Sequence, residues 1–219
     1  MKYFNAFTYL SLISTLLLFS SCEEDGEGVN DVQAELEVQM AEDIPADPNV
    51  TRNPDGSTPP PRFTFFNLTD GEIVDRADSA STRWDIALAG TTILVNGGTS
   101  GPGQGTAQVV NGTFEDLSEA PETGYASDQG SELAIPAGSG NGWYTYTGGS
   151  NPPQAILTIP GRIIVLQTAD GNYAKMEILS YYEGNPDTST EEFANFQTRP
   201  AGRHLTFQYV VQTNGSRNF

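Results

Sequence analysis

The chain has 219 residues, of which 28 are Asp or Glu and only 10 are Lys or Arg, so its formal net charge is -18. Nucleic-acid phosphates and acidic membrane surfaces repel such an anionic protein, which argues against a nucleic-acid partner. One Cys and one His exclude an intramolecular disulfide, a multi-His metal site and a haem site with two His ligands. The 23 Gly and 14 Pro favour a turn-rich β protein.

The first 21 residues have the organisation of a lipoprotein signal peptide. Lys2 is followed by a mostly apolar stretch, Ala6–Phe19, which is shorter than the roughly 20 residues that a membrane span requires. Small residues stand directly before Cys22, an arrangement that resembles the lipobox of bacterial lipoproteins. We therefore predict that residues 1–21 are removed and that lipid on Cys22 attaches the protein to a membrane. The alternative is that Cys22 lies by coincidence beside an ordinary signal cleavage site.

Residues 22–62 form an acidic, Pro-rich segment. Ten of the 28 acidic residues precede Arg52, the first cation after Cys22, and several prolines follow between residues 45 and 62. This composition predicts an extended, self-repelling tether. Acidic residues directly after the Cys also resemble the surface-export signal of Bacteroidetes lipoproteins, which implies a lipid-anchored position on the cell surface, at the outer membrane.

Residues 63–219 are predicted to form one all-β domain, an antiparallel sandwich or barrel-like structure of about ten short strands with minor helix. Short helices are expected at residues 114–120 and 190–197. The clearest hairpin turns at Ala169–Asn172, where Gly171 permits the tight backbone angles. The predicted strands cover residues 63–68, 72–75, 83–89, 91–96, 106–110, 142–147, 155–159, 162–168, 173–182 and 204–213. In the last strand, the residues predicted to face the core are Leu205, Phe207, Tyr209 and Val211.

Candidate catalytic groups are few, and we predict that the protein is not an enzyme. His204 lies on the polar face of a predicted strand with no Ser or Cys fixed beside it, so an exposed and passive His is expected. Acidic residues are numerous enough for a carboxylate hydrolase, yet no spacing singles out a pair. The Gly-rich segment 97–105 lacks a following Lys and helix, which favours a structural loop over a phosphate site.

Residues 185–192 offer two interpretations. Their Asp, Glu and Asn oxygens are of the kind that bind calcium, but the spacing of an EF-hand loop is absent. A turn followed by the start of a helix, capped by Thr188 or Ser189, explains the same residues and is favoured.

Several segments, in this order along the chain, resemble the HmuY family of Bacteroidetes: Trp84–Leu88, Asn96–Ala107, Gly142–Trp143, Ala169–Lys175 and Leu205–Tyr209. The resemblance covers most of the β domain. It implies an all-β, outward-facing lipoprotein that captures haem or a related tetrapyrrole for iron acquisition. It also implies a partner, a TonB-dependent outer-membrane receptor that takes over the haem.

The family's axial ligands are two His, or Met in some relatives, and the resemblance places them within residues 126–141 and near Gly148. This chain has neither His nor Met at those positions. The remaining donors nearby belong to a predicted strand, and ligand contact is assigned to Trp143, Tyr144 and Tyr146. Either Tyr would stack on a flat ligand or offer a phenolate, although plain strand packing is the alternative.

Met176 is expected in the core, because it shares a strand face with Ala174 and Ile178. Which residue, if any, binds a metal ion is left open. The alternative function on the same fold is a non-haem accessory protein or adhesin-type binding lipoprotein that contacts a receptor or a glycan. Co-purification of a receptor without haem would favour that alternative.

Overall fold

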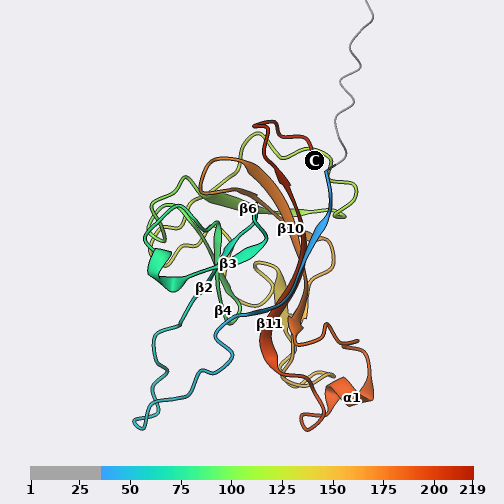
Figure 1. The fold of residues 1–219 in the computed structure, drawn as a ribbon. Helices are drawn as coiled ribbons and strands as arrows, with labels where there is room; N and C mark the ends of the chain where they lie inside the picture. Colours follow the sequence, from blue (N-terminus) through green and yellow to red (C-terminus); the bar gives the residue numbers. More distant parts are fainter. Residues whose placement is uncertain (1–35) are drawn as a thin grey trace, which may run out of the picture. The chain divides into compact units, whose positions relative to one another are not determined.

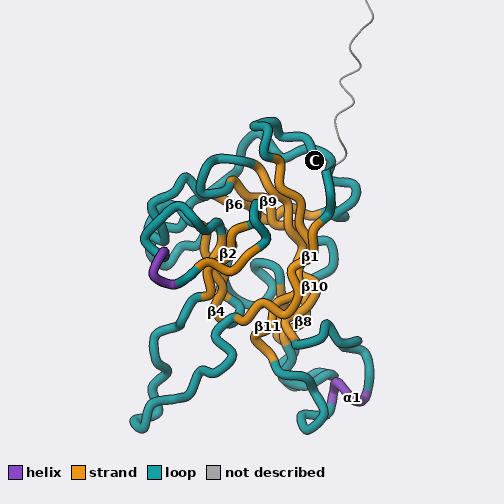
Figure 2. Tube along the Cα trace, viewed as in Figure 1, coloured by secondary structure: helices purple, strands orange, loops and turns teal. Residues whose placement is uncertain are grey.

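The computed structural model describes residues 36–219, which form three antiparallel sheets with little helix (Figure 1 and Figure 2). A five-stranded sheet has the order β1-β11-β10-β9-β6, a four-stranded sheet the order β3-β2-β4-β5, and a small sheet pairs β7 with β8. The strands are β1 (Gln39–Pro45), β2 (Thr64–Asn67), β3 (Glu72–Val74), β4 (Ile86–Ala89), β5 (Thr92–Val95), β6 (Thr106–Asn111), β7 (Tyr144–Tyr146), β8 (Ile156–Thr158), β9 (Arg162–Gln167), β10 (Tyr173–Tyr182) and β11 (Gly202–Gln212). The predicted all-β, antiparallel class is confirmed.

Each of the ten predicted strands has a counterpart in β2 to β11, with ends that differ by a few residues. The predicted hairpin is also present, because β9 and β10 pair antiparallel from Tyr173 opposite Gln167 to Met176 opposite Ile164. Gly171 in its turn has a φ of +85°, a left-handed angle that a residue without a Cβ adopts at little cost. The hairpin is closed by the Thr168 amide, which donates to the Asn172 carbonyl at 2.8 Å.

The main core lies where the three sheets face one another. It includes Phe66 of β2, Ile86 of β4, Trp143 and Tyr144 at β7, and the four β11 residues that were predicted to face inward, Leu205, Phe207, Tyr209 and Val211. The opposite face of the five-stranded sheet is covered as well. Ile163, Val165 and Val210 pack there with Phe114 and Ala120 from the loop after β6. The central strands are thus buried on both faces, which accounts for their nearly continuous apolar runs.

The structure differs from the sequence prediction within the proposed tether, because residues 39–45 form β1 on the edge of the five-stranded sheet. Figure 1 shows this blue strand along β11, and Gln39 and Pro45 lie opposite Tyr209 and His204. The register shifts between Ala41 and Ile44, where Asp43 has a φ of +51°. The folded part therefore begins before residue 63. The predicted signal peptide and Cys22 lie outside the described residues.

The two helix predictions had different outcomes. A single-turn helix, α1 (Glu191–Ala194), lies within the predicted 190–197, but its N-cap is Thr190 and not Thr188 or Ser189. Residues 114–120 form no helix. Thr113 caps a turn there through its hydroxyl, which accepts from the Asp116 amide at 3.2 Å, and Ala120 donates to the Arg217 carbonyl. A 3₁₀ turn at Arg76–Asp78 was not predicted. No helix in residues 36–219 is both long and apolar enough to span a membrane.

Candidate functional site

The three residues predicted to contact a ligand lie on and beside β7, with very different exposure. Trp143 and Tyr144 are buried, at 2% and 8% exposed, whereas Tyr146 is 48% exposed. Trp143 donates from Nε1 to the Thr91 carbonyl at 3.2 Å, and the hydroxyls of Tyr144 and Thr91 are hydrogen-bonded at 3.2 Å. Both buried rings are thus attached to the turn between β4 and β5. Only Tyr146 presents a free aromatic face to a large ligand.

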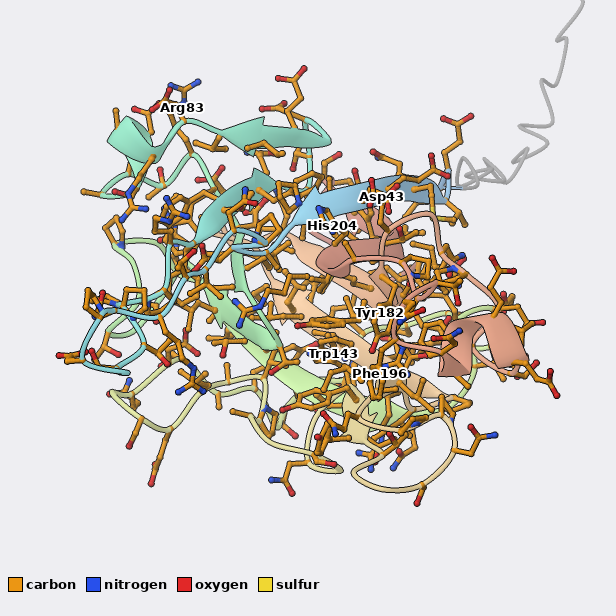
Figure 3. The ribbon with its side chains drawn as sticks, turned by 90° about the horizontal axis from the view of Figure 1, so that it is seen from below. Asp43, Arg83, Trp143, Tyr182, Phe196 and His204 are labelled. Atoms are coloured by element: carbon orange, nitrogen blue, oxygen red, sulfur yellow. The ribbon has the colours of Figure 1, made fainter. Side chains whose placement is uncertain are left out.

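Buried and half-buried aromatic rings continue from β7 across the end of β10. Neighbouring rings are 5.0 Å apart from Tyr144 to Trp143, 6.4 Å to Tyr181, 5.3 Å to Tyr182 and 4.8 Å to Phe193 of α1. We call these five residues the aromatic seam: Tyr144, Trp143, Tyr181, Tyr182 and Phe193. Figure 3 shows Trp143 and Tyr182 within the molecule, apart from Arg83 at its edge. Edge and tilted ring contacts of this kind stabilise the packing beyond the apolar area that they bury.

The loop before β7 is bound tightly along that strand. Gly140 donates its amide to the Tyr144 carbonyl at 2.9 Å, and the Tyr146 amide donates to the Ser139 hydroxyl at 2.8 Å. Ala134 and Ile135 of the same loop are buried in the main core. In the stretch where the family resemblance places an axial ligand, Ala134 and Ile135 are thus buried, most of the other residues are exposed, and its end is hydrogen-bonded to β7 beside Tyr146.

A cavity of about 240 Å³ includes in its lining Thr91, which is hydrogen-bonded to Trp143 and Tyr144 of the seam. We call it the Arg203 cavity, after the one basic residue among those that line it. Its lining residues come from the segment after β1, the β4–β5 turn and the start of β11: Asp47, Val50, Thr58, Pro59, Pro61, Ala89, Gly90, Thr91, Thr92 and Arg203. Through Thr91 it adjoins Tyr144 at the first ring of the seam.

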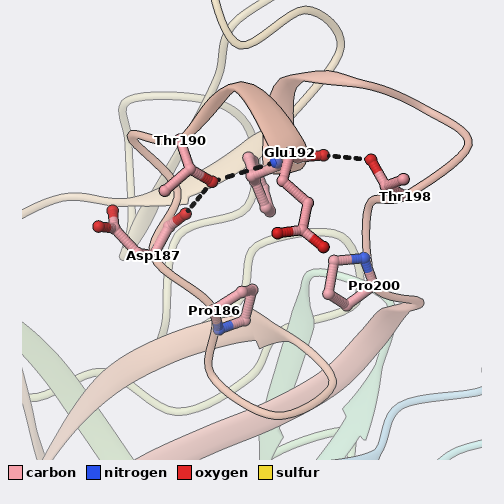
Figure 4. Close-up of a pocket in the computed structure, with 7 residues that line it drawn as sticks. Pro186, Asp187, Thr190, Glu192, Thr198 and Pro200 are labelled. Carbon is pink, nitrogen blue, oxygen red and sulfur yellow. Dashed lines mark hydrogen bonds between the residues drawn. The ribbon is translucent and has the colours of Figure 1, made fainter.

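The other end of the seam reaches a cavity of about 270 Å³ beside α1, shown in Figure 4. Phe193 lines it together with Pro186, Asp187, Thr190, Glu192, Thr198 and Pro200. Thr190 caps α1 by accepting from the Phe193 amide at 3.2 Å, and Thr198 donates to the Glu192 carbonyl at 2.6 Å. Of the side-chain oxygens in residues 185–192, the Asp187 carboxylate accepts from the Ser189 amide at 2.9 Å, which makes it part of the turn before α1. Within residues 36–219, no group of three or more His, Cys, Asp or Glu side chains is arranged to hold a metal ion.

A third hollow, of about 390 Å³, lies at the β3 edge of the four-stranded sheet. We call it the acidic groove, because five of the ten residues that line it are carboxylates: Asp70, Glu72, Asp75, Asp78 and Asp170. Its single cation, Arg83, forms an ion pair with Asp78 at 2.6 Å. An anionic ligand meets net repulsion there.

Three other potential haem donors, one His and two Met, lie elsewhere in the described residues. His204 was expected to be exposed, but it is half-buried at the β1–β11 pairing, and its Nδ1 is buried with no hydrogen-bond partner. Met176 is fully buried in the main core, as predicted. Met40, assigned to the tether from the sequence, lies in β1 and is 50% exposed.

Burial raises the pKa of the Tyr181 hydroxyl above its ordinary value, and the Arg203 guanidinium beside it opposes that shift. Tyr181 is therefore neutral at physiological pH. As the member of the seam beside Arg203, it contributes a hydroxyl dipole and a ring but no charge.

A family model described as HmuY protein matches residues 60–197 of this chain, which is more than half of its length. The chain belongs to the HmuY family. The family match includes Thr91 and every residue of the aromatic seam, but it ends before Arg203 and β11. The resemblance inferred from the sequence is confirmed.

Solved structures similar to this HmuY family member have low sequence identity to it. The apo HmuY analog of Tannerella forsythia is 14% identical over 82% of this chain and 98% of that chain, with a TM-score of 0.45. A HmuY-like heme-binding protein of Bacteroides vulgatus is 15% identical over 79% and 91%, with a TM-score of 0.46. A lipoprotein of Bacteroides fragilis is 14% identical over 68% and 83%, with a TM-score of 0.43. The comparison with curated proteins found no match.

The sequence pointed to the β7 residues but missed what surrounds them in this HmuY domain. Tyr181 and Tyr182 were assigned to a strand and Phe193 to a helix, without any role at a site. The local sequence signal for these rings was the pair of adjacent Tyr residues, Tyr181 and Tyr182, at the end of a long strand. Arg203 gave no signal, since its position depends on the pairing of β11 with β1 and on the distant β4–β5 turn.

Proposed function

We propose that this chain is a surface-anchored lipoprotein that binds haem or a related tetrapyrrole for iron acquisition and passes it to an outer-membrane receptor. Membership of the HmuY family over residues 60–197 is the observation that carries the proposal. The Bacteroides vulgatus protein named above as heme-binding, over 91% of whose length this chain aligns, is consistent with it. No catalytic role is proposed.

Tyr146 is the residue that we assign to direct contact with the ligand. A haem site needs aromatic and apolar walls and an axial donor, which in proteins is His, Met, Cys or Tyr. Tyr146 has the exposed phenol, and Trp143 and Tyr144 are the buried rings that support it. Two-His ligation is excluded because His204 is the only His in the chain. Tyr146 would therefore supply a phenolate or a stacking face.

Attachment and transfer rest on the N-terminal sequence. Lipid on Cys22 would hold the protein at the outer membrane, and the acidic residues that follow would place the domain on the cell surface. A TonB-dependent receptor is the partner expected to take the haem. The lipid anchor is tested by labelling cells that make the wild type or the C22A variant with a fatty-acid probe. We expect label on the wild type and none on C22A.

Haem binding is tested by titrating the full chain with haemin and recording the Soret band. We expect a saturable shift at micromolar protein, and a reduced shift in Tyr146→Phe, which removes the phenol and retains the ring. Tyr173→Phe is the matched control, since Tyr173 lies on β10 and its hydroxyl accepts from Gln167. No saturable shift in the wild type would contradict haem binding. A full shift in Tyr146→Phe would remove Tyr146 as the ligand.

A further inference from the structure

Arg203 lines its cavity with part of its hydrogen-bonding capacity unused. A guanidinium has five N–H groups; Nη1 donates to the Asp47 carbonyl at 3.2 Å, and the side chain also interacts with the Tyr181 hydroxyl. Within residues 36–219, no carboxylate forms an ion pair with Arg203. The backbone at Gly90 lies against the guanidinium, since a Cβ added there would be 3.6 Å from Nη1 and 3.7 Å from Cζ. Arg203 is thus held in place while several donors stay free.

The one acidic residue that lines the cavity is already neutralised by another cation. Asp47 is buried, and its two carboxylate oxygens accept from the Arg62 amide at 3.2 Å and from Arg62 Nε at 3.3 Å. Asp47 offers Arg203 only its backbone carbonyl. The lining residues Asp47 and Arg203 carry one charge of each sign, and Asp47 is compensated by Arg62, so the charge of Arg203 is left without a carboxylate partner within residues 36–219. A cation without a carboxylate partner in a concave site attracts anions.

The remaining walls of the cavity are apolar or hydroxyl-bearing. Val50, Pro59, Pro61 and Ala89 supply apolar surface, and Thr58, Thr91 and Thr92 supply hydroxyls. A free inorganic ion would leave that apolar surface unused. An apolar body that ends in an acidic group would satisfy both parts, with its charged end on the planar guanidinium and its body on the prolines.

We propose that the Arg203 cavity binds a carboxylate carried on an apolar body, with Arg203 as the anchoring residue. The identification of that body as the tetrapyrrole rests on the proposed function, in which a side-chain carboxylate of haem would enter the cavity while the ring lies over Tyr146. Thr91 joins the two places, because it lines the cavity and bonds to Tyr144, two residues before Tyr146. The carboxylate site itself does not require haem.

A structural role for Arg203 explains less of what is observed. Its bond to Asp47 fixes the segment after β1, and its contact with Tyr181 supports the seam. Those two contacts leave some N–H groups of the guanidinium without a partner, at a cavity whose one lining carboxylate is already paired with Arg62. A purely structural Arg203 would stabilise the fold and would leave the binding of a small carboxylate unchanged.

The test uses hexanoate and 1-hexanol as probes, with the full chain observed through the Nε–H signals of its arginines by NMR. We expect hexanoate to shift the Arg203 signal saturably, and 1-hexanol, which has the same chain length without charge, to leave it in place. Arg203→Gln should weaken hexanoate binding by about tenfold or more, since charge-assisted hydrogen bonds are lost. Arg76→Gln removes the same charge from an exposed residue outside the cavity and should leave binding unchanged.

A wild-type Arg203 signal that does not respond to hexanoate would overturn the proposal, whether or not Arg203→Gln folds. Equal hexanoate affinity of a folded Arg203→Gln variant would overturn it as well. Haemin and haemin dimethyl ester separate this proposal from the proposed function. If hexanoate binds through Arg203 and haemin does not bind, the carboxylate site stands and the haem function falls. If hexanoate does not bind and haemin and its ester bind equally well, the haem function stands and the carboxylate site falls.

Discussion

The Arg203 cavity and the acidic groove are two hollows of the same domain that differ in their balance of charge. Both include residues of the four-stranded sheet or its turns, but five carboxylates line the groove and its only cation, Arg83, is paired with Asp78. In the Arg203 cavity the only carboxylate, Asp47, is paired with Arg62, and the lining cation has no carboxylate partner within residues 36–219. The difference shows that the net charge of a chain does not predict the charge of its ligand, because the distribution of ion pairs sets the local potential.

The largest effect on stability is expected from removing the Trp143 ring, which is hydrogen-bonded to Thr91 at the Arg203 cavity. Trp143→Ala and Trp84→Ala each delete a fully packed indole and should each lower the free energy of unfolding by about 3–5 kcal/mol. Only Trp143→Ala should also weaken hexanoate binding, because Trp143 Nε1 holds the Thr91 carbonyl, whereas Trp84 donates to the Ser79 carbonyl near the groove. Urea unfolding and hexanoate titration measure the two quantities. Equal loss of binding in both variants would break the comparison.

A carboxylate introduced into the Arg203 cavity should reduce the difference in charge between the two hollows. Thr58 is exposed and lines the cavity, so Thr58→Glu places an intramolecular anion within reach of Arg203 and should weaken hexanoate binding by about tenfold or more. Asp75→Asn, a change in the groove, is the control and should leave that affinity unchanged. Unaltered binding by Thr58→Glu would show that hexanoate binds elsewhere.

The buried carboxyl of Asp85, near the carboxylates of the acidic groove, should make the protein less stable as the pH rises. Burial raises the pKa of Asp85 above the ordinary 3.8, the carboxylates of Asp170 and Asp70 add to the shift, and amide bonds from Ala169 and Leu68 oppose it. The native state therefore holds this proton more tightly than the unfolded chain. Its contribution is present below the unfolded pKa and is lost as the pH rises through the native pKa.

The free energy of unfolding of the wild type minus that of Asp85→Asn should therefore fall as the pH rises above the ordinary pKa of 3.8. Chemical denaturation at several pH values measures the difference, in which the other titrating groups largely cancel. A difference that rises with pH would mean that the two amide bonds outweigh the cost of burying the charge.

The smallest effect is expected at the exposed ion pair of the groove. Arg83→Gln breaks the contact with Asp78 between side chains that are 70% and 35% exposed, so stability should change by less than about 1 kcal/mol. Arg203→Gln provides the contrast, since it should change carboxylate affinity far more than Arg83→Gln does. Urea unfolding of the wild type and of Arg83→Gln, at low and at high salt, measures this change in stability. A cost of several kcal/mol would show that the groove is an organised charge network.

Short apolar runs and turn residues were sufficient to locate the regular part of the fold. The β9–β10 hairpin was predictable because its apolar run, its turn and Gly171 all lie close together in the sequence. β1 was missed since Glu42 and Asp43 gave it the composition of the tether, and its strand pairing depends on β11, more than 150 residues away. The 114–120 helix was wrong because the backbone there bonds to the C-terminal segment, which no local pattern indicates.

For the site, the sequence identified the residues of one strand but not their relation to the rest. It grouped Trp143, Tyr144 and Tyr146, and the structure separates the two buried rings from the exposed phenol. Arg203 and Thr91 meet at one cavity only after β1, β5 and β11 have found their partners. Such non-local placement could not be read from the order of residues.

The most direct test of haem binding beside Arg203 is paramagnetic broadening of backbone amide NMR signals of the full chain on addition of haemin. The high-spin iron of haemin broadens signals close to it, so the experiment reports both whether haemin binds and where. We predict saturable broadening at Gly90, Thr91, Tyr146 and Arg203, with the amides of Asp70 and Asp75 in the acidic groove unaffected. Broadening centred on the groove, or none at any haemin concentration, would contradict the account.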